Sequence, residues 1–168
     1  DQIGVVLKHC IAQGEALGGH NSGTVTIGRR EFSDIYEPLL KSTRNAVGVM
    51  AAYNDIDGVP CHINRALFEQ TLRKEIGYQG IVMADGVALD RLSDVFTDKK
   101  TAAAYALAAG IDLSLWDETY TKIAEAIDDQ VVDEKLLDQA VRRVLSVKFL
   151  LGLFEQPFAN DPKEYWDH

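Results

Sequence analysis

Polar and aromatic residues follow or end each of four short apolar runs in this chain. They are Lys8 and His9, Tyr53 and Asn54, Asp85, and finally Ser114, Trp116 and Asp117. Each one alone could be a turn or cap residue. If the runs are parallel strands, however, their carboxyl ends meet at one edge, where barrels and open sheets bind ligands. Lys and His can donate to hydroxyls, an aromatic ring can stack on a sugar, and a carboxylate can accept hydroxyl hydrogen bonds or attack an anomeric carbon.

The elements that must position these residues alternate between strand and helix patterns. The predicted strands are Ile3–Leu7, Ala46–Tyr53, Gly80–Ala84 and Ile111–Trp116. The predicted helices are Arg30–Arg44, Asn64–Gly77, Thr101–Gly110, residues 118–129 and residues 133–152, because apolar residues recur in them at helical spacing. Asn64 and Asp133 are expected N-caps, and Pro38 is expected to kink or end one turn.

Repeated strand–helix units with nearly continuous apolar strands predict an α/β fold with a parallel sheet covered by helices. A doubly wound sheet and a barrel both fit this pattern. An eight-fold barrel needs about 250 residues, so four units correspond to half of one. An open half would leave two unpaired edge strands. We therefore expect that a barrel would need strands from upstream or from a second copy.

Composition narrows the possible partners. The formal net charge of −9 argues against nucleic acid and anionic membranes, which need clustered Lys and Arg. No apolar run approaches the roughly 20 residues of a membrane span. The four histidines have no metal-ligand spacing and no nucleotide-binding glycine motif occurs, so neither a metal nor another cofactor is expected. The expected partner is a small carbohydrate.

Three blocks of the sequence resemble a known family. They are VVLKHC…GG.N (Val5–Asn21), the stretch Val47–Gly86, and AVRRVLSVKFLLGLFEQPF (Ala140–Phe158). Within the second block, AAYN…G.P is followed by the glycine signature E-x-G-Y-x-G and by a strand ending in Asp85. These blocks resemble, in order, the later half of the barrel domain of family 3 glycoside hydrolases of the β-glucosidase type.

The resemblance implies a retaining exo-β-glycosidase that hydrolyses terminal β-linked sugars. Asp85 matches the nucleophile that forms the glycosyl-enzyme intermediate, Lys8 and His9 match the pair that binds sugar hydroxyls, and Tyr53 matches the tyrosine near the nucleophile. A retaining enzyme needs a second carboxylate about 5–5.5 Å from the nucleophile. In the β-glucosidase branch that Glu comes from a following domain. Residues 1–158 are therefore expected to be a partial barrel domain, inactive alone, and residues 159–168 a linker or tail.

One departure from the family concerns the sugar-stacking wall. Gly86 stands where many members have Trp, so stacking must come from elsewhere, and Trp116 is the candidate. The related β-N-acetylhexosaminidases carry a D-x-H motif in the loop after Lys-His, whereas this loop offers only Glu15 and His20. The β-glucosidase reading is preferred for that reason.

Two readings from other classes remain open. The chain could be a non-catalytic sugar-binding or structural fragment, and Lys8 could be a Schiff-base lysine of a barrel lyase. Several other residues have simpler structural interpretations. We expect His20 and His62 to be loop histidines, Asp55 and Asp57 to be turn acids, and Asp117 and Glu118 to favour a helix start.

Overall fold

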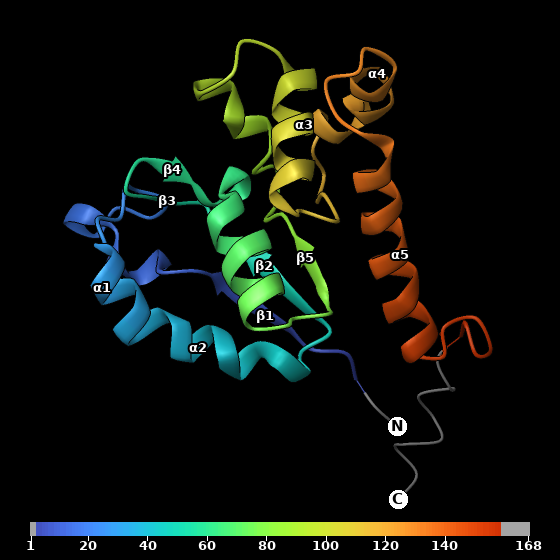
Figure 1. Cartoon of the computed structure of the whole chain (residues 1–168), viewed down its shortest axis with the longest axis horizontal. Coiled ribbons are helices and arrows are strands. Elements are labelled where there is room, and N and C mark those ends of the chain that lie inside the picture. The colour runs from blue at the N-terminus through green and yellow to red at the C-terminus, as the bar shows by residue number, and fades with distance from the viewer. Residues whose placement is uncertain (1–2, 159–168) are drawn as a thin grey trace, which may run out of the picture.

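A computed structural model describes residues 3–158 and is built around a three-stranded parallel sheet. Its strands are β1 (Val6–Cys10), β2 (Gly48–Ala51) and β5 (Ile81–Met83), and β2 lies between the other two. Helices connect and cover the strands (Figure 1). The expected α/β fold with parallel strands is confirmed.

Helical segments carry the chain between the strands and beyond them. The α-helices are α1 (Arg29–Glu31), α2 (Glu37–Ser42), α3 (Lys99–Ala109), α4 (Ile123–Asp128) and α5 (Glu134–Leu150). Wider π-helical segments are η3 (Phe32–Tyr36) and η6 (Ala66–Glu75). Short 3₁₀ turns are η1 (Gln13–Glu15), η2 (Leu17–Gly19), η4 (Thr43–Asn45), η5 (Cys61–Ile63), η7 (Asp90–Asp94) and η8 (Thr119–Lys122).

The predicted strand Ile111–Trp116 is wrong as a full strand. Only Leu113 forms a parallel bridge, to Met83 of β5. The chain still follows β5 for a few residues, because Asp112 N donates to Val82 O at 2.7 Å and Ala84 N donates to Leu113 O at 2.8 Å. Trp116 then adopts a positive φ of 65°, which is incompatible with an extended strand.

Other predicted boundaries shift in ways that matter for the site. The first strand starts later than Ile3, so Lys8 and His9 lie inside β1 rather than after it. The predicted helix Arg30–Arg44 forms as a run from α1 to η4. Pro38 does not end it. Because Pro38 has no N–H to donate, the preceding turn widens, and Glu37 N donates to Phe32 O.

A hairpin that was not predicted follows β2. It consists of β3 (Asp55–Ile56) and β4 (Val59–Pro60). The acids between β2 and β4 were expected to be turn residues, and they are. Asp55 Oδ1 accepts from Gly58 N at 2.9 Å, and Asp57 Oδ1 accepts from Ile27 N at 2.9 Å. The hairpin brings the chain to η5 and so to His62.

The glycine signature ahead of Asp85 has a packing explanation. Gly77 ends η6 with a φ of 79°, in the left-handed region that favours glycine. A Cβ on Gly80 would lie 2.3 Å from the hydroxyl of buried Tyr78 and 2.6 Å from the carbonyl oxygen of Val47. Only glycine therefore allows this turn to enter β5, the strand that leads to Asp85.

A buried ion-pair cluster joins the helices to the sheet. Asp112 accepts from Arg73 Nη2 at 2.5 Å and from Arg143 Nη1 at 2.8 Å. It also accepts from Val82 N of β5 at 2.8 Å. Arg73 comes from η6 and Arg143 from α5, so one carboxylate links both helices to β5. Asp112 thus has a structural role.

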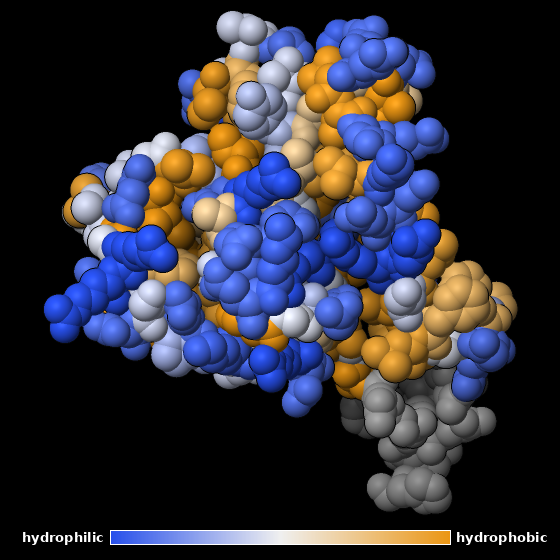
Figure 2. Space-filling view, in the orientation of Figure 1, coloured by the Kyte–Doolittle hydropathy of each residue, from blue (hydrophilic) through white to orange (hydrophobic). Residues whose placement is uncertain are grey.

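Apolar surface remains uncovered on two sides of the described residues. Along β1, Val5, Val6 and Leu7 are 52%, 37% and 40% exposed. Along α5 and the turns after it, the exposed apolar residues are Val141, Leu145, Phe149 and Phe154. Figure 2 shows apolar surface at the C-terminal end of α5. The predicted tail, residues 159–168, lies outside the described residues. Within residues 3–158, no helix has the length and apolar character of a bilayer span.

Candidate active site

Asp85 and His9 meet at the carboxyl ends of two strands that flank β2. Nε2 of His9 lies 3.1 Å from Oδ2 of Asp85. That oxygen is buried and accepts no aligned hydrogen bond from the described residues, whereas Oδ1 accepts from Gly86 N at 2.7 Å. The carboxylate therefore has one oxygen held by a backbone N–H and one that accepts no such bond and faces the His9 imidazole.

Tyr53 lies beside this carboxylate. Its hydroxyl donates to the carbonyl oxygen of Gly86 at 2.6 Å. Burial raises the pKa of Tyr53, and the charge of Asp85 and a hydrogen bond with it act in the same direction. The Arg91 guanidinium lies 5.1 Å from the centre of the Tyr53 ring. The phenol is therefore held in its protonated form next to Asp85.

His62 was expected to be an ordinary loop histidine, but it is buried and contacts the backbone of Asp85, the candidate nucleophile. Only 3% of its surface is exposed, and its Nε2 accepts from the backbone N–H of Asp85 at 3.3 Å. Burial lowers its pKa to about 4, and the charge of Asp85 only partly opposes this. No signal in the sequence marked it, because the hairpin that delivers it was not predicted.

Trp116 stands against the position where a side chain at residue 86 would begin. A Cβ on Gly86 would lie 3.5 Å from the Cε3 and Cζ3 ring atoms of Trp116 and 3.7 Å from the hydroxyl of Tyr53. Trp116 is 81% exposed. The indole thus presents an exposed face next to Gly86, the residue after Asp85. Because Gly86 has no side chain, this space is left open.

Lys8 is the one predicted site residue that the structure does not bring to Asp85. Lys8 is exposed, and within residues 3–158 it makes no ion pair with that carboxylate. The neighbouring His9 makes the contact with Asp85 instead. The peptide bond between the two residues is cis.

The acids at the end of the predicted fourth strand cap backbone groups. Asp117 Oδ1 accepts from Leu89 N at 2.7 Å, and its Oδ2 accepts from Leu115 N at 3.1 Å. Asp90 accepts from the backbone and the hydroxyl of Thr119. Glu118 is exposed and pairs with Lys99. These acids hold the loops around the site and are not oriented as a second reacting carboxylate.

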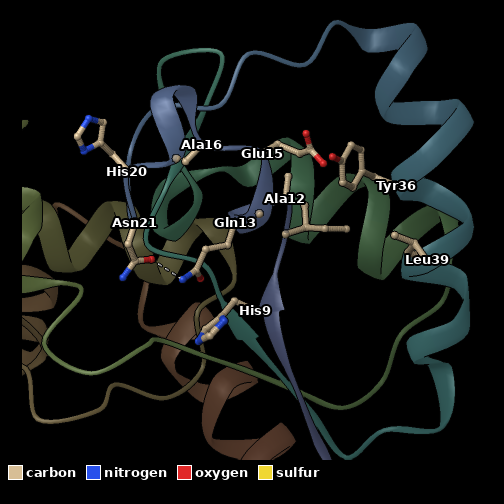
Figure 3. A pocket seen from close by; sticks show the side chains of 12 residues that line it. His9, Ala12, Gln13, Glu15, Ala16, His20, Asn21, Tyr36 and Leu39 are labelled. Atoms are coloured by element: carbon tan, nitrogen blue, oxygen red, sulfur yellow. Dashed lines mark hydrogen bonds between the residues drawn. The ribbon is translucent and has the colours of Figure 1, made fainter.

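A cavity of about 620 Å³ adjoins His9 (Figure 3). Its walls come from the loop after β1 and from the helical run that contains Tyr36 and Leu39. Gln13 Nε2 donates to Asn21 Oδ1 at 2.9 Å, while Gln13 Oε1 is buried without a partner among the described residues. Polar groups therefore line a space that begins at the imidazole in contact with Asp85.

Within the described part of the chain, no three His, Cys, Asp or Glu side chains are grouped to hold a metal ion. The two cysteines, Cys10 and Cys61, are buried and free.

We predict that acidification destabilises the folded chain through His62. The unfolded chain binds a proton at His62 below its ordinary pKa of 6.5, whereas the folded chain does so only near pH 4. The free energy of unfolding should therefore fall as pH falls from about 6.5 to 4, with about 2 kcal/mol lost between pH 7 and pH 5, at about 1.4 kcal/mol per unit of pKa difference. Urea unfolding at several pH values measures this slope. It should flatten by that amount in His62→Gln and persist in the exposed-loop control His20→Gln.

An α/β fold with parallel strands, with a carboxylate, an imidazole and a phenol together at the strand ends, is typical of enzymes that act at this edge of a sheet. Residues 2–147 match the glycosyl hydrolase family 3 N-terminal domain. The chain belongs to glycoside hydrolase family 3.

Named relatives agree with this family. The chain is 38% identical over 165 residues to a putative β-xylosidase of Formosa agariphila, covering 94% of this chain and 22% of the relative. It is 35% identical over 164 residues to a periplasmic β-glucosidase of Salmonella typhimurium, covering 94% and 21%. A crystal structure of a β-glucosidase from Listeria innocua superposes with a TM-score of 0.90 at 30% identity, covering 99% of this chain and 24% of that one. The chain thus spans about a fifth to a quarter of the length of these proteins.

Proposed function

We propose that this chain carries the nucleophile of a retaining exo-β-glycosidase that releases terminal β-linked sugars. The observation that carries the proposal is the meeting of Asp85 and His9 at 3.1 Å, at the strand ends of a family 3 glycoside hydrolase chain. Oδ2 of Asp85 is the free oxygen, and His9 stands where it can donate to a sugar hydroxyl. The adjoining cavity has a volume typical of small-molecule sites.

The proposed reaction proceeds in two steps. Asp85 attacks the anomeric carbon, the bond to the leaving oxygen breaks, and an acid delivers a proton to that oxygen. Water then attacks the glycosyl ester, gives up a proton to the same group, and releases the sugar with its original configuration. His9 and Lys8 bind hydroxyls, protonated Tyr53 stands beside the nucleophile, and Trp116 stacks on the sugar. No carboxylate among the described residues is assigned the acid/base role, which we assign to a following domain.

The chain is further proposed to be the later half of a TIM-type barrel. Three parallel strands and the short bridge to β5 fit one side of such a barrel. The exposed apolar edge of β1 and the exposed apolar residues of α5 are surfaces that further barrel units would cover. Residues 1–158 would then be part of the barrel domain, and 159–168 a linker. The protein in which this chain is joined to those upstream units and to the acid/base domain is called the intact enzyme.

Covalent trapping tests the proposed function. A 2-deoxy-2-fluoro-β-glucoside with a good leaving group should inactivate the intact enzyme, because it slows hydrolysis of the intermediate more than its formation. Mass spectrometry of a proteolytic digest should then locate one added fluoroglucosyl group on Asp85. A label on another carboxylate would refute the assignment. If the protein neither hydrolyses aryl glycosides nor becomes labelled, the non-catalytic alternative is favoured. If borohydride traps an aldehyde substrate on Lys8, the Schiff-base lyase is favoured.

The sugar itself is decided by comparing substrates. Relatives of this chain are named β-xylosidase and β-glucosidase. Rates on aryl β-glucoside, β-xyloside and β-N-acetylglucosaminide distinguish these substrate classes. A glucoside or xyloside is expected to be preferred. Preference for the N-acetylglucosaminide would favour the hexosaminidase branch.

Substitution of Trp116 should weaken substrate use. Because an exposed aromatic face contributes about 0.5–1.5 kcal/mol of stacking, Trp116→Ala should lower kcat/KM on an aryl glucoside by about 3- to 10-fold. Trp116→Phe should recover most of the loss. Tyr105→Ala, which removes an exposed ring on α3, is the matched control and should leave kcat/KM unchanged. Equal kcat/KM in wild type and Trp116→Ala would exclude the stacking role.

A further inference from the structure

The backbone amide of Asp85 is satisfied by a side chain rather than by a neighbouring strand. Its N–H donates to Nε2 of His62 at 3.3 Å. Regular pairing of β5 with β2 has already ended at Met83. The position of the Asp85 backbone therefore depends on an imidazole that comes from η5, a distant segment of the chain.

The same imidazole also lies against Tyr53. The two ring centres are 6.5 Å apart with an interplanar angle of 45°. Tyr53 in turn donates to the carbonyl oxygen of Gly86. His62 and Tyr53 thus hold two backbone groups at and next to Asp85: the amide N–H of Asp85 itself and the carbonyl of the following residue, Gly86.

His62 can do this only as an uncharged acceptor. A protonated imidazole has no free lone pair on Nε2 and would turn a donor toward the Asp85 N–H. Burial lowers the pKa of His62 to about 4, so the ring is uncharged near neutral pH.

We infer that His62 is a positioning residue that fixes the aim of the Asp85 carboxylate by accepting a hydrogen bond from its backbone. The inference rests on the proposed role of Asp85 as nucleophile. His62 itself is too deeply buried to touch a sugar. Its loss should therefore lower kcat and leave KM nearly unchanged, because a displacement of about 1 Å at a reacting group can cost about 100-fold in rate.

Two polar variants of different reach provide the test in the intact enzyme. In His62→Gln the amide oxygen extends as far as Nε2 did and can accept from Asp85 N. In His62→Asn the side chain is also polar but too short. We expect kcat on an aryl glucoside to fall about 10- to 100-fold in His62→Asn and by no more than about threefold in His62→Gln. The rate of fluoroglycosyl labelling should follow kcat. His20→Asn, in an exposed loop, is the matched control.

Hydrogen exchange at the Asp85 amide gives a readout that does not depend on activity. Exchange of the Asp85 amide should be slow in wild type and in His62→Gln, and faster in His62→Asn. If His62→Gln and His62→Asn have equal kcat and equal exchange rates, the inference is overturned. This holds whether the two variants are both impaired or both normal. If wild type is not labelled at Asp85, the proposed function fails, and the exchange comparison still decides whether His62 holds this amide.

Discussion

Replacing Asp85 by glycine in the intact enzyme is expected to lower hydrolysis of an aryl β-glucoside by about 10⁴-fold or more. The reason is that the substitution removes the carboxylate proposed to form the glycosyl ester, so the two-step route is lost. The fold should survive, because the one aligned hydrogen bond of the carboxylate joins Oδ1 to the N–H of the adjacent Gly86 and links no distant segments. Steady-state kinetics with circular dichroism as a folding check measure both effects.

Azide supplies the decisive control for this variant. The glycine leaves space where the carboxylate stood, and an azide ion there can attack the anomeric carbon and displace the aryl leaving group. The product should be a glycosyl azide of inverted configuration, because the second displacement is missing. Asp94→Gly, in the exposed turn nearby, should behave as wild type and gain nothing from azide. An Asp85→Gly enzyme with undiminished turnover would refute the assignment.

The second large effect is expected from Asp112, which has no part in the reaction. Asp112→Ala should lower the free energy of unfolding by about 3–5 kcal/mol. The substitution leaves the Arg73 side chain, only 7% exposed, with a charge whose main partner is gone. It also leaves the N–H of Val82 without its acceptor. Urea unfolding, compared at equal pH, measures the change.

A surface ion pair is the matched control for Asp112. Lys99 and Glu118 are 2.5 Å apart, but their side chains are 42% and 78% exposed. Because water screens such pairs, Glu118→Ala should cost less than about 1 kcal/mol. If Asp112→Ala cost no more than Glu118→Ala, the buried cluster would not be what joins η6 and α5 to β5.

Several features could be predicted from local patterns. Asp85 stands out because an apolar run ends on an acid, and the glycine signature before it predicts the turn that leads into β5. Asn64 and Asp133 accept from backbone N–H groups of the helices they precede, as expected of N-caps. These predictions succeed because each depends on interactions within a few residues.

Other features could not be predicted because they depend on distant contacts. His62 reaches Asp85 across 23 positions of sequence, through a hairpin whose two-residue strands are too short to show a periodic pattern. The pairing of Asp112 with Arg73 and Arg143 joins residues 39 and 31 positions apart in the sequence. The predicted fourth strand fails because its apolar residues pack beside β5 without a continuing ladder.

By itself, the sequence determined the alternation of the three parallel strands with helices, the parallel α/β class and the candidacy of Asp85, His9, Tyr53 and Trp116, because apolar periodicity and turn residues act locally. Only the tertiary structure decided how these residues meet. The packing of β1 against β5 through β2 brings His9 rather than Lys8 to Asp85, the chain reversal at Trp116 puts the indole beside Gly86, and burial makes His62 a neutral acceptor. Distances and burial of this kind arise from packing between segments far apart in sequence, and no local pattern encodes them.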